Sequence, residues 1–224
     1  ANTLAIQNAI NAAVGEYPVI LYDLYPCNGL TILSDTTIIA LQKGHGLIGS
    51  GAISGIVASL NDVTIDGVSL FGALYLQLSG DAVGTLAKRI TLRDIYIETS
   101  INNTALYGVA MNNMDGLAVE NLHVHLTATS GDTRGIGLGV VHNSNLRGLR
   151  VTGGVSMGIE TYGGDVNNPS LLNTRITGII IDKDDAFTAE SGDHGVYLHG
   201  CRECEFDGIF VDGTWGASQY ALKF

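Results

Sequence analysis

Acidic and aromatic residues between positions 160 and 199 are the first candidates for chemistry in this chain of 224 residues. Two carboxyl groups roughly 5–9.5 Å apart can hydrolyse a glycosidic bond, one as the acid and the other as nucleophile or base. We predict that the catalytic carboxylates are Glu160, Asp165 and Asp193. Tyrosine rings nearby suit sugars, because each has an apolar face and a polar tip.

A repeated pattern predicts the elements that position these residues. Two short alternating strands, joined by one small or polar residue, occur six times. The joints are Gly67, Asp94, Asn121, Gly148, Gly178 and Gly208, at spacings of 27, 27, 27, 30 and 30 residues. Gly, Asn and Asp are the residues that tolerate a left-handed backbone conformation. Each joint therefore predicts a sharp bend between two strands.

A third strand precedes most of these pairs and begins with glycine. Its starting residues are Gly108, Gly135, Gly158 and Gly195. The distance from this glycine to the next joint is 13 residues in three cases and 20 after Gly158. The longer distance predicts an insertion of about seven residues within Gly163–Asn173. A similar extra loop is predicted near Gly80–Ala87.

Three strands per repeat predict an all-β fold, a parallel β-solenoid with three sheets around one core. A β-sandwich and an up-and-down barrel are the alternatives, but both should show hairpin signals, and Asn28-Gly29 is the only Asn-Gly pair. Residues 1–15 have helical spacing of apolar residues and should cap the open end. Residues 16–224 should form the solenoid, and we expect it to continue beyond both ends of this chain.

Strand alternation places the candidate residues on one outer face. With Val109, Ile136, Ile159 and Val196 inward, the outward residues are Ala110, Asn112, Gly137, Gly139, Glu160, Tyr162, Tyr197 and His199. The two glycines predict a floor on which a ligand ring could rest. The loops Leu126–Arg134, Gly163–Asn173 and Lys183–His194 should flank this face. We predict that the substrate-binding residues are Asn112, Arg134, Tyr162, Tyr197 and His199.

The segment Thr3-Leu-Ala-Ile-Gln-Asn-Ala-Ile-Asn-Ala-Ala13, followed by these repeats, resembles the start of right-handed parallel β-helices of the pectate-lyase-like superfamily. Within it, the chain is most similar to domains of bacteriophage tailspikes and polysaccharide depolymerases. The resemblance implies a right-handed coil, a polysaccharide as partner, an extracellular or virion-associated location and a homotrimer. Unlike most members, the chain has no strand rich in Gly and Asp before the helix segment.

Charge excludes several other partners. The formal net charge is −11, which disfavours nucleic acids and anionic membrane surfaces. No apolar run is long enough to span a membrane. The acidic stretch Asp182–Asp185 could hold Ca²⁺, but a solvated loop is the preferred interpretation, so no metal or other cofactor is expected.

These observations predict a glycoside hydrolase acting on a bacterial surface or extracellular glycan. A polysaccharide lyase using the same groove is one alternative, with Lys183, Arg134 or Arg202 as the base. A glycan-binding or structural shaft segment without activity is the other. The fold alone does not choose among them.

Overall fold

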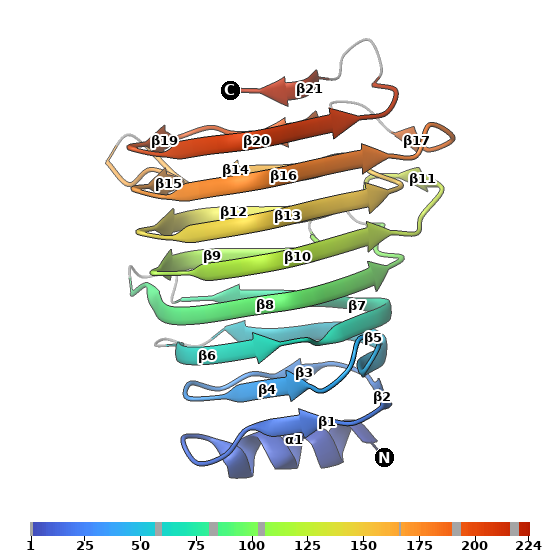
Figure 1. Ribbon diagram of the computed structural model, residues 1–224, viewed down its shortest axis with the longest axis vertical. Helices are drawn as coiled ribbons and strands as arrows, with labels where there is room; N and C mark the ends of the chain where they lie inside the picture. Colours follow the sequence, from blue (N-terminus) through green and yellow to red (C-terminus); the bar gives the residue numbers. More distant parts are fainter. Residues whose placement is uncertain are drawn as a thin grey trace.

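The repeated bend coils the chain into a stack of parallel strands with a helix at one end (Figure 1). The computed structural model describes residues 2–56, 60–80, 85–102, 106–165, 167–189, 194–215 and 220–224. The strands at the front of Figure 1 run to the right and those behind run to the left while the chain climbs, so the coil is right-handed. Every pairing between strands is parallel, as the sequence predicts.

The helix α1 spans Asn2–Ala13. The strands of the first half are β1 (Val19–Leu21), β2 (Leu24–Cys27), β3 (Leu30–Thr31), β4 (Thr37–Ala40), β5 (Gly46–Ile56), β6 (Asn61–Asp66), β7 (Ser69–Ser79), β8 (Ala87–Thr99), β9 (Val109–Asp115) and β10 (Ala118–Leu126). Those of the second half are β11 (Ser130–Gly131), β12 (Arg134–His142), β13 (Asn145–Gly153), β14 (Met157–Tyr162), β15 (Leu171–Leu172), β16 (Arg175–Lys183), β17 (Thr188–Ala189), β18 (His194–Tyr197), β19 (Cys201–Arg202), β20 (Glu205–Asp212) and β21 (Tyr220–Lys223).

The predicted bends are confirmed at all six joints. The φ angles at Gly67, Asp94, Asn121, Gly148, Gly178 and Gly208 are 69°, 52°, 55°, 67°, 69° and 65°. Because the strands continue on both sides of the bend, a single element such as β10 or β13 contributes to two faces of the solenoid. At this corner the side-chain amide of Asn121 donates a hydrogen bond to Asp94 Oδ1 over 2.8 Å, and this bond links successive turns.

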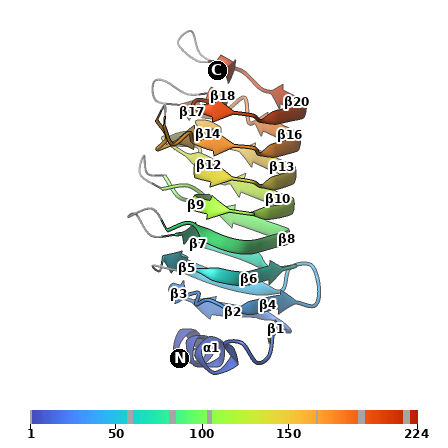
Figure 2. The same cartoon turned by 90° about the vertical axis from the view of Figure 1, so that its left-hand side faces the viewer.

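Three stacks of strands enclose the core, and Figure 2 shows their edges from the side. One stack precedes the bends and a second follows them. The third, here called the C stack, contains parts of β5, β7 and β12 together with β9, β14, β18 and β21. The predicted inward residues Val109, Ile136, Ile159 and Val196 are in register with one another and fully buried.

The predicted insertions are confirmed by the register of the strands that flank them. Tyr162 pairs with Gly139 and Leu171 pairs with Val141, which places seven additional residues between Tyr162 and Leu171. In the same way, Ser79 pairs with Asn112 while Ala87 pairs with Met114, so the extra loop near Gly80–Ala87 is also confirmed. Insertions of this kind leave the register of the strands intact.

Helix α1 closes the first turn through its apolar face and through one amide. Ile10 is fully buried in the core. The Gln7 side chain donates to the carbonyl of Thr31 over 3.0 Å and accepts from the amide of Thr31 over 2.8 Å. It therefore replaces the missing neighbour of strand β3, whose edge would otherwise present unpaired backbone groups. Among the described residues, no helix is long and apolar enough to cross a membrane.

Replacement of Gln7 tests this capping interaction. Gln7→Leu keeps the size of the side chain but removes both hydrogen bonds to Thr31, so the free energy of unfolding should fall by about 1–2 kcal/mol. Chemical denaturation followed by circular dichroism measures the change. Gln42→Leu is the control, because Gln42 is exposed and its side chain makes no hydrogen bond with the described residues. Equal stability of the two variants would contradict the capping role.

Candidate functional site

The outer face of the C stack carries a connected group of polar and aromatic side chains. Ala110, Gly137 and Glu160 occupy one row of this face, and Asn112, Gly139 and Tyr162 occupy the next. The rows follow from strand alternation, since the residues between them point into the core. Three of the predicted site residues therefore lie close together on the strands that flank β12, namely Asn112 on β9 and Glu160 and Tyr162 on β14.

The glycine floor predicted from the sequence exists, but the chain's own tyrosines cover it. The rings of Tyr107 and Tyr162 stack at 5.4 Å between centroids and 9° between planes. A Cβ atom added at Gly137 would lie 2.8 Å from the Tyr162 ring and 2.9 Å from the Tyr107 ring. At Gly139 it would lie 2.8 Å from Tyr162. The glycines therefore make room for these two rings, and the expectation of a bare floor for a ligand is wrong.

Glu160 is held by two donors above this floor. The Tyr107 hydroxyl donates to Glu160 Oε2 over 2.5 Å, and Arg134 Nη1 donates to the same oxygen over 3.1 Å. Arg134 also donates to the Tyr107 oxygen over 3.1 Å, so the three groups form a closed triangle. The Glu160 side chain is 15% exposed, and its other oxygen accepts no hydrogen bond from the described residues. One carboxylate oxygen thus remains available to a ligand.

A second carboxylate lies on the other side of the same guanidinium group. Arg134 Nε faces Asp132 Oδ1 at 3.4 Å. The Asp132 loop is anchored, because the Asp132 amide donates to Asn102 Oδ1 over 2.9 Å and Asn102 donates back to the carbonyl of Ser130. Asp132 and Glu160 thus contact the same guanidinium group, and glycoside hydrolysis needs two carboxyl groups near each other.

The backbone joins two of the loops predicted to flank this face. Strand β11 of the Asp132 loop pairs in parallel with β17, with Ser130 opposite Thr188 and Gly131 opposite Ala189. This small two-stranded sheet fixes the first and third predicted loops against each other. Two contacts therefore fix the loop that carries Asp132, the hydrogen bonds with Asn102 and the pairing with β17.

Burial decides the protonation of the two tyrosines. Desolvation, followed by the negative charge of Glu160, raises the pKa of Tyr107 well above its usual range. Burial also raises the pKa of Tyr162, whose hydroxyl donates to Asn112 Oδ1. Burial opposes the charge of Arg134, but its partners Tyr107, Glu160 and Asp132 outweigh this effect and its pKa is raised. Both tyrosines are therefore proton donors rather than bases at neutral pH.

A pocket of about 240 Å³ opens beside the stacked rings. Its walls include Tyr75 and Gln77 of β7, Asn112 of β9 and the two tyrosines Tyr107 and Tyr162. Glu160 is not part of the wall, but Tyr107 contacts both the pocket and the Glu160 carboxylate. A ligand in this pocket would meet aromatic faces and amide groups, a combination that suits a sugar.

The remaining predicted substrate-binding residues form an adjoining cluster. Tyr197 pairs in register with Glu160, and its ring lies 5.3 Å from that of His199. His194 is 5.3 Å from the Tyr197 ring, and the Lys223 ammonium lies 4.7 Å from its centroid. Tyr197 lies on β18, the strand next to the one that carries Glu160, and His199 follows that strand. The two residues thus extend the same face toward β21.

Of the other two predicted catalytic carboxylates, Asp165 makes no contact with this network among the described residues. Asp165 is exposed in the inserted loop, where its Oδ1 accepts hydrogen bonds from the amides of Asn167 and Asn168 over 2.7 and 2.8 Å. These bonds lower the pKa of Asp165 and shape the turn. Asp193 lies outside the described residues, so its predicted role stays a prediction.

The acidic stretch Asp182–Asp185 makes contacts within the chain. Asp184 accepts from the amide of Ala186, and Asp185 accepts from the amide and hydroxyl of Thr214. Among the described residues, no group of three or more His, Cys, Asp or Glu is arranged to hold a metal ion. Of the residues considered for a lyase base, Lys183 is buried and donates to the carbonyl of Thr214.

Sequence reasoning missed Tyr107 and did not select Asp132. Tyr107 directly precedes the strand that begins at Gly108, in a stretch without periodicity. The signal that could have found it is the pair Gly137 and Gly139, because two outward glycines on one strand indicate that a flat group lies above them. Asp132 was recognised only as part of a flanking loop.

No protein-family model matches this chain, and no curated protein and no solved structure is significantly similar to it. The structure establishes a parallel β-helix, an architecture compatible with proteins that act on polysaccharides. The function of the chain is therefore inferred from the geometry of the site.

The protonated state of Tyr107 can be tested through the pH dependence of stability. Its pKa in the folded chain is raised above the ordinary value of about 10, so the folded state holds this proton more tightly than the unfolded chain. The resulting stabilisation is present below about pH 10 and is lost as the pH rises further. Tyr107→Phe cannot ionise, and its free energy of unfolding should fall less between pH 9 and pH 11 than that of the unmodified chain.

Chemical denaturation at a series of pH values provides the measurement. Tyr17→Phe is the matched control, since Tyr17 is 71% exposed and lies outside the site. The same slope in the Tyr107→Phe variant and the unmodified chain would show that the buried hydroxyl does not retain its proton in the folded state.

Proposed function

We propose that this chain is a polysaccharide-acting β-helix domain that hydrolyses glycosidic bonds at the Glu160 site. The observation that carries the proposal is the Glu160 carboxylate, fixed on one oxygen by Tyr107 and Arg134 with its other oxygen open, beside a pocket lined by aromatic rings. Preorganised acceptors of this kind contribute most when little reorganisation is needed during the reaction.

The hydrogen bonds suggest a division of roles. Glu160 accepts from both of its partners, which suits a nucleophile or a general base better than a proton donor. The second carboxyl group must then protonate the leaving oxygen, and Asp132 is the one that shares Arg134 with Glu160. Asp165 and Asp193, selected from the sequence, are the alternatives for this acid.

A lyase mechanism is less well supported by these contacts. It needs a base that removes a proton next to the sugar carboxylate, and Arg134 already donates to Asp132, Glu160 and Tyr107. Tyr107 is unsuited to the same role, because burial and Glu160 raise its pKa. A net charge of −11 also disfavours the acidic glycans on which lyases act.

The resemblance of the Thr3–Ala13 segment to the cap of pectate-lyase-like tailspike domains supports the choice of a bacterial surface glycan as substrate. It also suggests an extracellular or virion-associated location and assembly as a homotrimer. These parts of the proposal depend on the resemblance and not on the site.

Glu160→Gln tests the hydrolase directly. It keeps the size of the side chain but removes the nucleophilic carboxylate, so release of reducing ends should fall by roughly 10²- to 10⁴-fold. The assay uses purified capsular, O-antigen and exopolysaccharides of several bacteria. Glu120→Gln is the control, because Glu120 is half-buried on another face and forms an ion pair only with Arg147 among the described residues. Thermal melting confirms that both variants fold.

The same assay distinguishes the alternatives. A second series, Asp132→Asn, Asp165→Asn and Asp193→Asn, identifies the acid, and we expect the largest loss for Asp132→Asn. Products with unsaturated, ultraviolet-absorbing ends would identify a lyase instead. Binding of a glycan without any turnover, unchanged in Glu160→Gln, would assign the chain to the non-enzymatic class and refute the hydrolase.

A further inference from the structure

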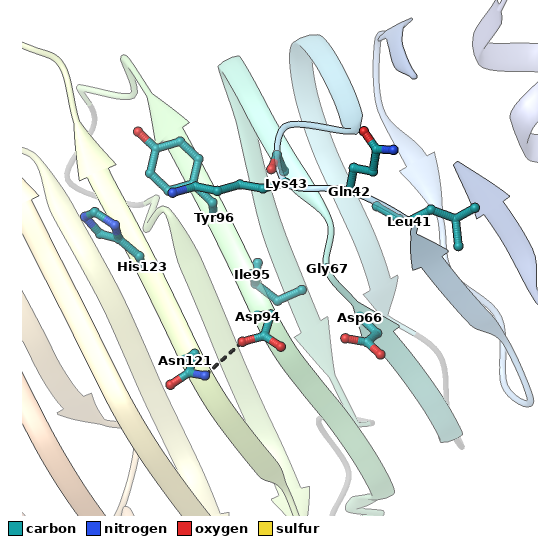
Figure 3. A pocket seen from close by; sticks show the side chains of 12 residues that line it. Leu41, Gln42, Lys43, Asp66, Gly67, Asp94, Ile95, Tyr96, Asn121 and His123 are labelled. Carbon is teal, nitrogen blue, oxygen red and sulfur yellow. Dashed lines mark hydrogen bonds between the residues drawn. The ribbon is translucent and has the colours of Figure 1, made fainter. Parts of the chain in front are cut away.

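A second pocket lies at a different corner of the solenoid from the Glu160 site. It has a volume of about 550 Å³ and sits at the bends formed by Gly67, Asp94 and Asn121 (Figure 3). Pockets of this size hold small ligands of several rings. Neither the sequence analysis nor the hydrolase site gives it a role.

An insertion in the first turn forms the wall of this pocket. Ile39 pairs with Asp66 and Gly46 pairs with Ser69. The first turn therefore has four more residues at this corner than the next turn, which passes it with the single bend at Gly67. The insertion turns back through a hydrogen bond from the His45 amide to the carbonyl of Gln42, and the Gly44 amide donates to the Ser69 hydroxyl. The Gly44-His45-Gly46 sequence therefore builds a loop that projects beside the bends.

The side chains on the floor of the pocket differ in size from one strand to the next. In register, Ser69 is followed by Tyr96 and then by His123. The small Ser69 leaves a hollow, and the Tyr96 ring forms its far side. Tyr96 is held by Phe71 at 5.8 Å and by His123 at 5.2 Å between ring centroids. Its hydroxyl donates to Glu98, so the ring is fixed as part of the pocket wall.

Polar groups of both signs surround this ring. Figure 3 shows the Lys43 side chain extending toward Tyr96 from the loop, with Asp66 and Asp94 at the bends. Lys43 is exposed and makes no ion pair or hydrogen bond with the described residues. Asp66 pairs with Arg93, and Asp94 accepts from Asn121. Donors and acceptors thus alternate around a fixed aromatic face.

The charge of the pocket decides between ligand classes. Burial, followed by the charges of Arg150, His125 and Lys43, lowers the pKa of His123 to about 4, so its imidazole is neutral at pH 7. Lys43 is then the single cation of the pocket wall, opposite two carboxylates. Arg93 neutralises Asp66 and Lys43 offsets Asp94, so the wall has no excess positive charge to attract a phosphate or an acidic sugar. Sugar hydroxyls, in contrast, can both donate to carboxylates and accept from an ammonium group.

We propose that this corner is a second, non-catalytic binding site for a neutral oligosaccharide, which stacks on Tyr96 and receives a hydrogen bond from Lys43. The site is independent of Glu160. It would hold a glycan on the solenoid whether or not the C stack cleaves it.

Titration with trisaccharides tests the proposal. The probes are maltotriose, cellotriose, mannotriose and triacetylchitotriose, with trigalacturonate as the acidic counterpart, and the readout is the NMR shift of the Tyr96 and His123 ring signals. At least one neutral probe should shift these signals. Its dissociation constant should rise roughly tenfold in Tyr96→Ala and in Lys43→Ala, as expected when an aromatic contact or a charged hydrogen bond is lost.

Two controls separate this site from the rest of the chain. Lys88→Ala removes an exposed lysine of β8 outside the pocket and should leave binding unchanged, as should Glu160→Gln. Because Lys43 lies on an exposed loop, its variant tests the site even if Tyr96→Ala unfolds. The proposal is overturned if no neutral trisaccharide shifts these signals, if trigalacturonate binds more tightly, or if Lys43→Ala binds like the unmodified chain.

Discussion

The structure depends on one backbone constraint, a left-handed bend that recurs at the same corner in six successive turns. Parallel strands stay in register only if each turn closes to the same geometry, and a single residue with φ between 52° and 69° makes the closure at the sharpest corner. Where this residue is not glycine it is Asp94 or Asn121, and the two side chains bond to each other. The chain also varies in length, both away from this bend, as between Tyr162 and Leu171, and at the same corner of the first turn, where four additional residues form a wall of the second proposed site.

The candidate catalytic face shows how the solenoid converts a repeated backbone into a particular site. Gly137 and Gly139 lower the surface of one turn by the height of a side chain. Tyr107 enters this space from an aperiodic segment, and Tyr162 enters it from the neighbouring strand. The stacked rings leave Glu160 little freedom, since its partner Tyr107 is itself packed against backbone. The rigidity of the carboxylate therefore follows from the absence of two side chains below it.

The parts of this architecture that repeat could be predicted from the sequence, and the parts that occur once could not. The spacing of the joints predicted the bends, and the alternation predicted the burial of Val109 and Ile159. It also placed Glu160 and Tyr162 on one face. The role of Gly137 was misjudged because the ring that covers it comes from Tyr107, which has no counterpart in other turns. Loop carboxylates such as Asp132 follow no period, and only the contact with Arg134 distinguishes them from solvated charges.

The distribution of charge connects the two proposed sites. Most arginines of the described residues face a carboxylate one turn away, in the pairs Arg89–Asp62, Arg93–Asp66, Arg147–Glu120, Arg150–Asp182 and Arg175–Glu205. Exposed ion pairs of this kind stabilise the fold little. They do neutralise arginines that would otherwise be able to bind a polyanionic ligand. The excess of acidic residues then leaves the surface negative on average. Arg134 contacts Glu160 and Asp132, and Lys43 lies in a wall that also contains Asp66 and Asp94. Because carboxylates accompany both cations, both proposed sites favour a glycan that carries hydroxyl groups rather than charge.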